Sequence, residues 1–394
     1  MSITAIREYI ALLWEKYQEA KKVGKIEILD ELCRNLNIHR KSATRLMTAK
    51  SSPALKRGQG SGGRQKYSQA AKNELKTLWR EMGYLGAVRL KAALPDWLPF
   101  YEGPTVNDTI KSELLLMSVA TIERTLKDSK ADLNRRLNTG TRREKTKHET
   151  VVPIKNFTEI PKEPGHCEVD CVAHCGGSIS GTFIWTVTLT DMDSGWTECE
   201  AIWGKSGFAV RHALMEIEKR LPFKIKGLYF DNGCEFLNDE VIDTFALAGR
   251  EIPLKVFRGR PYKKNDQPYV EQKNYTHVRQ FFGYERLDWK LAQQLMNSVY
   301  RGLWRQLQNH FYPQIKLVEK IRCGAKIKRK VGQPKTPYAR LMENPFMTEE
   351  QKNVLRAEHK PLNPFALRKY LRKKLRDFRL YAGKDKVELG RYAV

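Results

Sequence analysis

The sequence lacks any run of about 18 apolar residues, the length that a membrane-spanning helix needs. It also lacks, at its start, the basic and then apolar segment of a secretory leader. Cysteine is sparse: seven residues, scattered from Cys33 to Cys323, are typical of reduced thiols and not of a disulfide framework. We therefore expect a cytoplasmic protein with no membrane partner.

Cysteine and histidine form one cluster, between positions 166 and 175. His166, Cys167, Cys171, His174 and Cys175 are zinc-ligand types, but their spacing matches no common zinc site. The segment also has the pattern of a strand and a turn. A zinc site is therefore not the favoured interpretation.

Acidic residues are too few to balance the basic ones. The 394 residues include 45 Asp and Glu against 71 Lys and Arg, which gives a formal charge of +26 and a pI near 9.7. Such a surplus attracts polyanions, nucleic acid above all. A ribosomal or membrane-surface role, or a merely soluble basic protein, would have the same composition. With 41% apolar residues the chain is not disordered, and its length predicts two to four domains.

Residues 1–50 predict a helix-turn-helix DNA-binding domain. Apolar residues recur at helical spacing, and helices over 26–36 and 40–48 flank the turn 37–39. In such a unit the last helix contacts DNA. The alternative is a three-helix bundle with a solvated basic face. The side chains that the last helix would offer to DNA are Arg40, Lys41, Ser42, Thr44 and Arg45.

Two segments are predicted to be linkers. Residues 51–66 (SSPALKRGQGSGGRQK) have little apolar content, and Arg57 and Arg64 in them could lie along DNA phosphates. Residues 139–158 contain a run of charged residues and separate the helical part from the strands predicted beyond residue 159.

Residues 67–138 predict a second helical, helix-turn-helix-like domain. Ser118 precedes an apolar helical pattern as an N-cap residue. The helix after it resembles a recognition helix, with Thr121, Arg124 and Lys127 facing outward.

From about residue 159 the pattern changes to β-strands. Three runs rich in β-branched and aromatic residues predict antiparallel strands, and helices then alternate with two further strands. The order β-β-β-α-β-α-β-α is that of an RNase H-like α/β fold with a mixed five-stranded sheet, so by analogy residues 159–312 form such a core. The expected strands cover residues 168–174, 182–190, 196–203, 225–230 and 252–257.

Residues 313–394 form a strongly basic C-terminal region. Residues 326–335 (KIKRKVGQPK) show no core pattern, whereas residues 367–378 carry an apolar stripe between basic faces. A basic amphipathic helix can bind nucleic acid, a membrane surface or a protein. The context favours a role in DNA binding or assembly.

Three carboxylates stand where the predicted fold could unite them. Asp170 lies within a predicted strand, where a charged group is costly unless it has a role. Asp231 ends an apolar strand, and Glu271 follows Pro268, which suits the start of a helix. The first two carboxylates are 61 positions apart, and the second and third are 40 apart.

The surroundings of these carboxylates resemble the integrase core of bacterial insertion-sequence transposases, relatives of retroviral integrases. The likeness rests on residues 231–236 (DNGCEF) and above all on residues 259–266 (GRPYKKND) with 270–274 (VEQKN). It covers roughly residues 160–310. The second carboxylate interval is longer than in retroviral integrases, and residues 267–269 (QPY) stand where relatives often have Asn-Ala-His.

The resemblance implies a DDE transposase in which Asp170, Asp231 and Glu271 hold two Mg²⁺ ions, for which Mn²⁺ can substitute. Double-stranded DNA, both element ends and target, would be cut and joined by in-line phosphoryl transfer. The family also implies a homo-oligomer assembled on DNA. The protein would then be associated with the nucleoid in a bacterial cytoplasm.

Basic and amide side chains near the third carboxylate predict further DNA contacts. Lys263 and Lys264 precede its helix. A rotation of about 100° per residue places Asn274 and Arg279 to either side of the carboxylate. The same rotation turns Lys273 away, toward a phosphate contact from another side or none.

Two other functions fit the same residues. A nuclease of the same fold would hydrolyse DNA without joining it, and Glu168 or Asp266 would have to supply a further carboxylate. A DNA-binding regulator with an inactive core is the second alternative, against which the intact triad argues. An RNA-binding protein is more distant, because the usual aromatic stacking motifs are not apparent.

Overall fold

The computed structural model describes residues 3–50, 66–103, 106–134, 162–230, 245, 254–258, 270, 273–323 and 326–391. The chain divides into two compact units, residues 1–68 and 69–394. The predicted boundary near residues 139–158 lies outside the described residues.

The N-terminal unit consists of three helices, as the sequence predicts: α1 (Ile3–Glu19), α2 (Lys22–Leu36) and α3 (Arg40–Met47). Asn37 ends α2 in the left-handed conformation (φ 51°), which asparagine tolerates better than most residues. His39 then caps α3 by accepting the backbone N–H of Lys41. The buried side chains that hold the three helices together are Leu13, Leu29, Leu32, Ala43 and Met47.

The second unit begins with a helical segment. It comprises α4 (Gln69–Glu81), α5 (Ala87–Trp97), the 3-10 turn Leu98–Phe100, α6 (Asp108–Leu116) and α7 (Val119–Asn134). Ser118 caps α7 as predicted, because its hydroxyl accepts the N–H of Thr121 at 3.2 Å.

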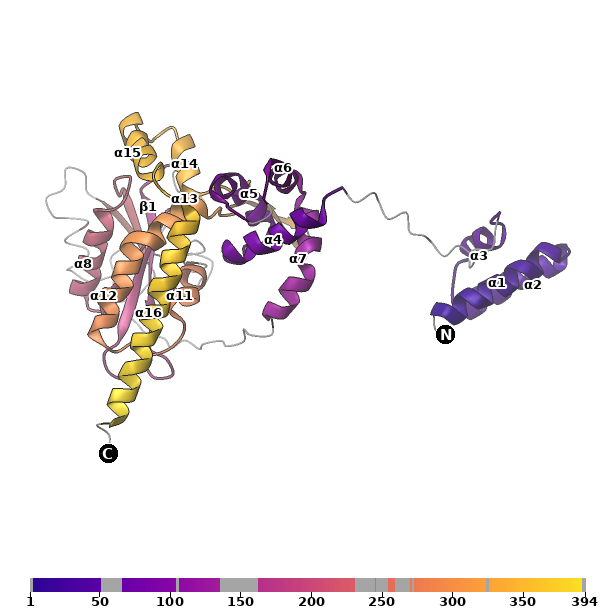
Figure 1. Cartoon of the computed structure of the whole chain (residues 1–394), viewed down its shortest axis with the longest axis horizontal. Coiled ribbons are helices and arrows are strands. Elements are labelled where there is room, and N and C mark those ends of the chain that lie inside the picture. Colours follow the sequence, from indigo (N-terminus) through magenta and orange to yellow (C-terminus); the bar gives the residue numbers. More distant parts are fainter. Residues whose placement is uncertain are drawn as a thin grey trace. The chain divides into compact units, whose positions relative to one another are not determined.

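A mixed five-stranded sheet forms the centre of this unit, as predicted. Its order is β3-β2-β1-β4-β5, with β1, β2 and β3 antiparallel and β1, β4 and β5 parallel. Figure 1 labels β1 within this sheet. The strands are β1 (His166–Ala173), β2 (Ile184–Asp191), β3 (Thr197–Trp203), β4 (Gly227–Phe230) and β5 (Lys255–Arg258).

Helices cover both faces of the sheet. Val187 and Leu189 of β2 share one buried cluster with the apolar face of α8 (Gly207–Glu218). Thr186, which points to the opposite face, has its hydroxyl 3.3 Å from that of Tyr300. Tyr300 belongs to a helical stretch made of α12 (Lys290–Val299), the π-helix η5 (Tyr300–Trp304) and α13 (Arg305–Phe311), which is kinked at Gly302.

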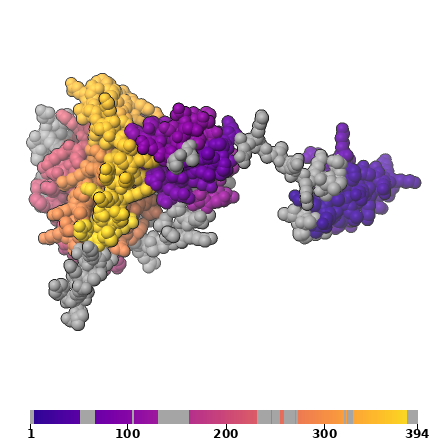
Figure 2. Space-filling view, viewed as in Figure 1, coloured from indigo at the N-terminus to yellow at the C-terminus, as the bar shows by residue number. Residues whose placement is uncertain are grey.

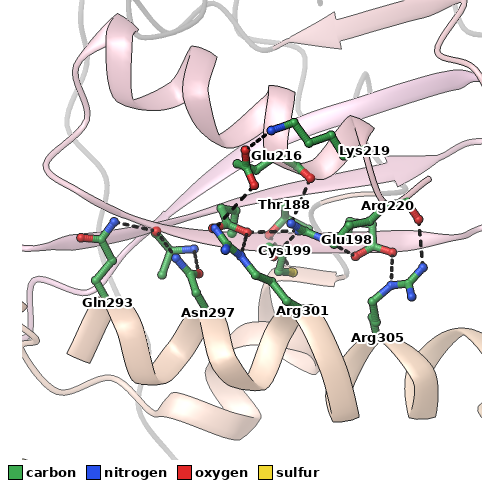
Figure 3. Close-up of polar contacts among 12 residues, drawn as sticks. Thr188, Glu198, Cys199, Glu216, Lys219, Arg220, Gln293, Asn297, Arg301 and Arg305 are labelled. Atoms are coloured by element: carbon green, nitrogen blue, oxygen red, sulfur yellow. Dashed lines mark hydrogen bonds and ion pairs between the residues drawn. The ribbon is translucent and has the colours of Figure 1, made fainter. Parts of the chain in front are cut away.

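Strand β3 is an edge strand, and side-chain amides from the α12–α13 stretch satisfy its backbone. Asn297 accepts the N–H of Ala201 at 2.6 Å and donates to its carbonyl at 2.9 Å. Asn309 makes the same pair of bonds with Thr197, both at 2.9 Å. Each amide thus takes the place of a peptide group of a sixth strand. Figure 3 shows Asn297 beside β3.

Two buried glutamates of β3 are neutralised by arginines from the surrounding helices (Figure 3). Glu198 accepts from Arg305 at 2.9 Å, and Glu200 accepts from Arg301 at 3.1 Å. Arg220, just after α8, lies within ion-pair distance of both carboxylates. The pairs tie the sheet edge to α8 on one side and to η5 and α13 on the other.

The C-terminal region contains a hairpin that the sequence did not indicate. It is formed by β6 (Leu317–Cys323) and β7 (Lys326–Val331), followed by α14 (Pro337–Glu343), α15 (Glu349–His359) and α16 (Pro364–Arg391). Leu317 is 41% and Val331 57% exposed. The hairpin residues whose burial the structure describes are all exposed, and exposed strands show no core periodicity, which explains why the pattern was not recognised.

Helix α16 and the helical segment are fastened to the rest of this unit. Trp97 donates its indole N–H to the carbonyl of Phe311 at 3.1 Å. Arg368 of α16 donates to the Tyr312 hydroxyl at 2.8 Å, and Arg372 donates to Glu81 of α4 at 2.9 Å. Figure 2 shows the helical segment, in purple, directly against the orange and yellow C-terminal elements.

No helix among the described residues is long and apolar enough to cross a membrane.

The edge bonds of β3 lead to a first prediction. Asn309→Leu removes both amide bonds and leaves a buried peptide unpaired, so we expect the free energy of unfolding to fall by about 1–3 kcal/mol. Urea denaturation measures the change. Asn353→Leu, at an exposed position of α15, is the control and should change stability little. Equal stabilities of the two variants would contradict the role of Asn309.

A buried histidine pair leads to a second prediction. His310 Nδ1 lies 3.1 Å from His359 Nδ1, and burial, His359 and Arg305 together lower the pKa of His310 to about 3. Because an unfolded histidine titrates near 6.5, the neutral folded form loses stability as the pH falls from about 6.5 toward 3. We expect His310→Phe to weaken this pH dependence by about 1.4 kcal/mol per pH unit.

Urea denaturation of the wild type and His310→Phe at several pH values between 4 and 7 checks this expectation. His212→Gln, on an exposed position of α8, should keep the wild-type pH dependence. If the free energy of unfolding depended on pH equally in the wild type and in His310→Phe, the role of His310 would be contradicted.

Candidate functional site

Asp170 lies on the central strand β1, between β2 and β4. Side chains alternate along this strand: Cys167 and Val169 join the apolar cluster under α8, whereas Glu168 and Asp170 point to the other face. Asp170 is 5% exposed and Glu168 is 0% exposed. Two carboxylates therefore occupy one buried face of the central strand, where apolar side chains would be cheaper.

The segment around position 271 is hydrogen-bonded to these two carboxylates. The backbone N–H of Val270 donates to Glu168 Oε2 at 2.9 Å. The side-chain amide of Asn274 donates to Asp170 Oδ2 at 2.5 Å. Asn274 begins the π-helix η4 (Asn274–Arg279), which continues into α11 (Gln280–Phe282). Residues on both sides of position 271 are therefore bonded to β1.

Oxygen atoms of the kind that bind hard cations meet at this point. Asp170 Oδ1 accepts the N–H of Cys171 at 2.8 Å, and its Oδ2 accepts from Asn274. Asn274 Oδ1 is buried and has no hydrogen-bond partner among the described residues. A carboxylate beside an amide oxygen that lacks a hydrogen bond fits a hard divalent cation such as Mg²⁺.

Strands β1 and β4 pair in parallel with a constant offset. His166 lies opposite Gly227 and Glu168 opposite Tyr229, so paired residues are 61 positions apart. The last residue of β4 is Phe230.

Several predicted site residues lie outside the described residues. Among the described residues, no three His, Cys, Asp or Glu side chains form a group that could hold a metal ion. Two members of the triad lie outside those residues. The residues concerned are Asp231, Glu271, Lys263, Lys264, Arg57 and Arg64.

Lys273 and Arg279 both have positions inside the fold. Lys273 is 7% exposed, and burial together with Arg89 lowers its pKa well below the usual range. This burial argues against the phosphate contact predicted for it. Arg279 is partly buried, donates to the carbonyl of Ala173 at 2.6 Å and lies over the ring of Tyr284.

The predicted DNA-binding residues of α3 lie together on the surface of the N-terminal unit. Arg40, Lys41, Thr44 and Arg45 line one open surface pocket, and Ser42 is exposed. Arg40 is also paired with Asp30 of α2. In the second unit, Arg124 is exposed on α7 and donates to the Thr121 hydroxyl at 3.4 Å. Both helices present polar and basic side chains to solvent.

The bond between Glu168 and Val270 was not predicted from the sequence. The two residues are 102 positions apart, and no local pattern links them. The one sequence feature that pointed to Glu168 is its position two residues before Asp170, which places both side chains on one face of a strand.

The described residues thus define an α/β protein with a mixed five-stranded sheet, flanking helices and a buried acidic site on its central strand. Over 348 residues the chain is 33% identical to the uncharacterized protein y4rM of Sinorhizobium fredii, in an alignment that spans 86% of this chain and 96% of y4rM. The chain therefore belongs to the family of y4rM.

No family model matches the chain. Among solved structures, it is similar to the catalytic core domain of BIV integrase in crystal form I, with 15% identity and a TM-score of 0.23. That overlap covers 30% of this chain and 68% of the integrase chain. A similarity of this size carries no argument about function.

Proposed function

We propose that the chain is a DDE-type transposase that cuts double-stranded DNA and joins it to a target in a reaction dependent on divalent metal ions. The observation that carries the proposal is the pair of hydrogen bonds from Val270 and Asn274 to the carboxylates of β1. Glu271 lies between these two donors in the sequence. These hydrogen bonds support the proposal that Asp170 and Glu271 act in one site.

The register of the sheet supports the inclusion of the second carboxylate. Asp231 follows Phe230 directly and is 61 positions after Asp170, which is the offset at which β1 and β4 pair. Residues paired in adjacent strands are separated by about 5 Å and point to the same face. On this ground the proposal includes Asp231 with Asp170 in the triad.

In this proposal Asp170, Asp231 and Glu271 hold two Mg²⁺ ions, with Mn²⁺ as a substitute. Bound metal ions would stabilise charge on the attacking and leaving oxygens of a phosphodiester. Asn274 orients the Asp170 carboxylate by donating its side-chain N–H to Oδ2. The nucleophile would be water in the cleavage step and a DNA 3′-hydroxyl in the joining step.

DNA would be bound by basic surfaces on both units. Helices α3 and α7 present Arg45 and Arg124 to solvent, and in this proposal they act as recognition helices. The hairpin β6–β7 adds exposed Lys328, Arg329 and Lys330. The formal charge of +26 supports contact with both element ends and target DNA. Assembly of several copies on DNA is part of the same proposal.

The catalytic role of Asp170 is tested by Asp170→Asn. We expect joining of a labelled oligonucleotide 3′-hydroxyl to a supercoiled plasmid in Mn²⁺ to fall about a thousandfold or more, because the variant loses a metal-binding charge. Affinity for the same DNA should stay near the wild-type value. Asp288→Asn, which removes an exposed carboxylate paired with Arg286, is the control.

Full joining activity of Asp170→Asn would refute the transposase proposal. The same assay separates the nuclease alternative, because a nuclease would nick the plasmid without incorporating the labelled strand.

The DNA-binding role of α3 is tested by the double variant Lys41→Ala/Arg45→Ala. If both side chains contact phosphates, the slope of log affinity against log salt concentration should decrease by about two. Fluorescence anisotropy with a duplex of random sequence measures this slope. The control Arg7→Ala/Lys22→Ala removes two exposed basic residues from α1 and α2. An equal decrease in the control would leave α3 without a special role.

A further inference from the structure

We infer that Glu168 is a positioning residue that fixes the segment carrying Glu271 against β1, and not a ligand of the metal ions. The inference rests on the proposed function. The contact that supports this role is the hydrogen bond from the backbone N–H of Val270 to Glu168 Oε2, at 2.9 Å.

The position of Glu168 suits this task. It is two residues before Asp170 on the same face of the central strand, and β2 and β4 pair with it at Thr190 and Tyr229. Glu168 and Val270 are both 0% exposed. A buried hydrogen bond of this kind keeps its geometry because water does not compete for the donor.

The two bonds to β1 act at different points of the segment. Val270 is one residue before Glu271, and Asn274 is three residues after it, about one helical turn. One bond holds the backbone at Val270, and the other holds Asn274, the first residue of η4. Together they hold the backbone of Val270 and the side chain of Asn274 against β1, on either side of Glu271 in the sequence.

The chemistry of the contact separates positioning from metal binding. A group that only accepts a backbone N–H can be replaced by the uncharged oxygen of a glutamine. A metal-binding carboxylate also supplies negative charge, which glutamine lacks. Glu168→Gln should therefore be tolerated if Glu168 positions the segment, and should be as harmful as Asp170→Asn if Glu168 binds metal.

The experiment uses the full chain with four variants: Glu168→Gln, Glu168→Ala, Val270→Pro and Asp170→Asn. Calorimetry with Mn²⁺ measures metal affinity, and the plasmid-joining assay is repeated over a range of Mn²⁺ concentrations. Val270→Pro removes the donor N–H without altering Glu168. Thermal unfolding shows which variants are folded, and the glutamine and proline variants keep the test valid if Glu168→Ala does not fold.

Asp191→Ala is the matched control. Asp191 is also a fully buried carboxylate of this sheet that accepts backbone N–H groups, from Gly165 and Ser194, but these donors belong to other segments. It should lower thermal stability without changing Mn²⁺ affinity. This control separates loss of stability from loss of positioning.

We expect the dissociation constant for Mn²⁺ to rise about 10- to 100-fold in Glu168→Ala and Val270→Pro, as for other residues that orient metal ligands. Glu168→Gln should stay close to the wild type. Wild-type Mn²⁺ affinity in Glu168→Ala and Val270→Pro would overturn the inference, as would a glutamine variant as defective as Asp170→Asn. If Asp170→Asn itself binds Mn²⁺ and joins DNA normally, the proposed function fails instead.

Discussion

The fold depends on satisfying a sheet edge that lies inside the protein. Strand β3 has one hydrogen-bonded neighbour, and helices bury its other side, where unpaired peptide groups would be costly. Asn297 and Asn309 supply donors and acceptors in place of another strand. Because Asn297 and Asn309 are 12 residues apart and bond to Ala201 and Thr197, the α12–α13 stretch must run alongside β3. The hydrogen-bonding groups at the edge of β3 therefore determine where this stretch lies.

The central strand β1 joins this framework to the candidate site. One face of β1 contributes apolar side chains to the cluster under α8, and the other face carries Glu168 and Asp170. The same strand therefore holds the core together and binds the segment that starts near Val270. Any shift of β1 by one residue would exchange these two faces, so its register is fixed from both sides.

The strands and helices that bury an apolar face could be predicted from the sequence because their patterns are local, whereas the hairpin β6–β7 could not. Alternation identified β1, β2 and β3 to within two residues, and helical spacing identified α2 and α3. The amides of Asn297 and Asn309 could not be assigned, because a polar residue on a helix does not reveal a partner about 100 positions away. Of the triad, the structure describes Asp170 alone, so Asp231 and Glu271 stay predictions.

Helix α16 links separate parts of the second unit by hydrogen bonds. Arg368 and Arg372 link this helix to the core and to α4, and Trp97 links α5 to α13. The helical segment is therefore hydrogen-bonded both to α16 and to the residue that ends α13. If α7 reads DNA as proposed, these hydrogen bonds would limit how far along the duplex the bases under α7 can lie from Asp170.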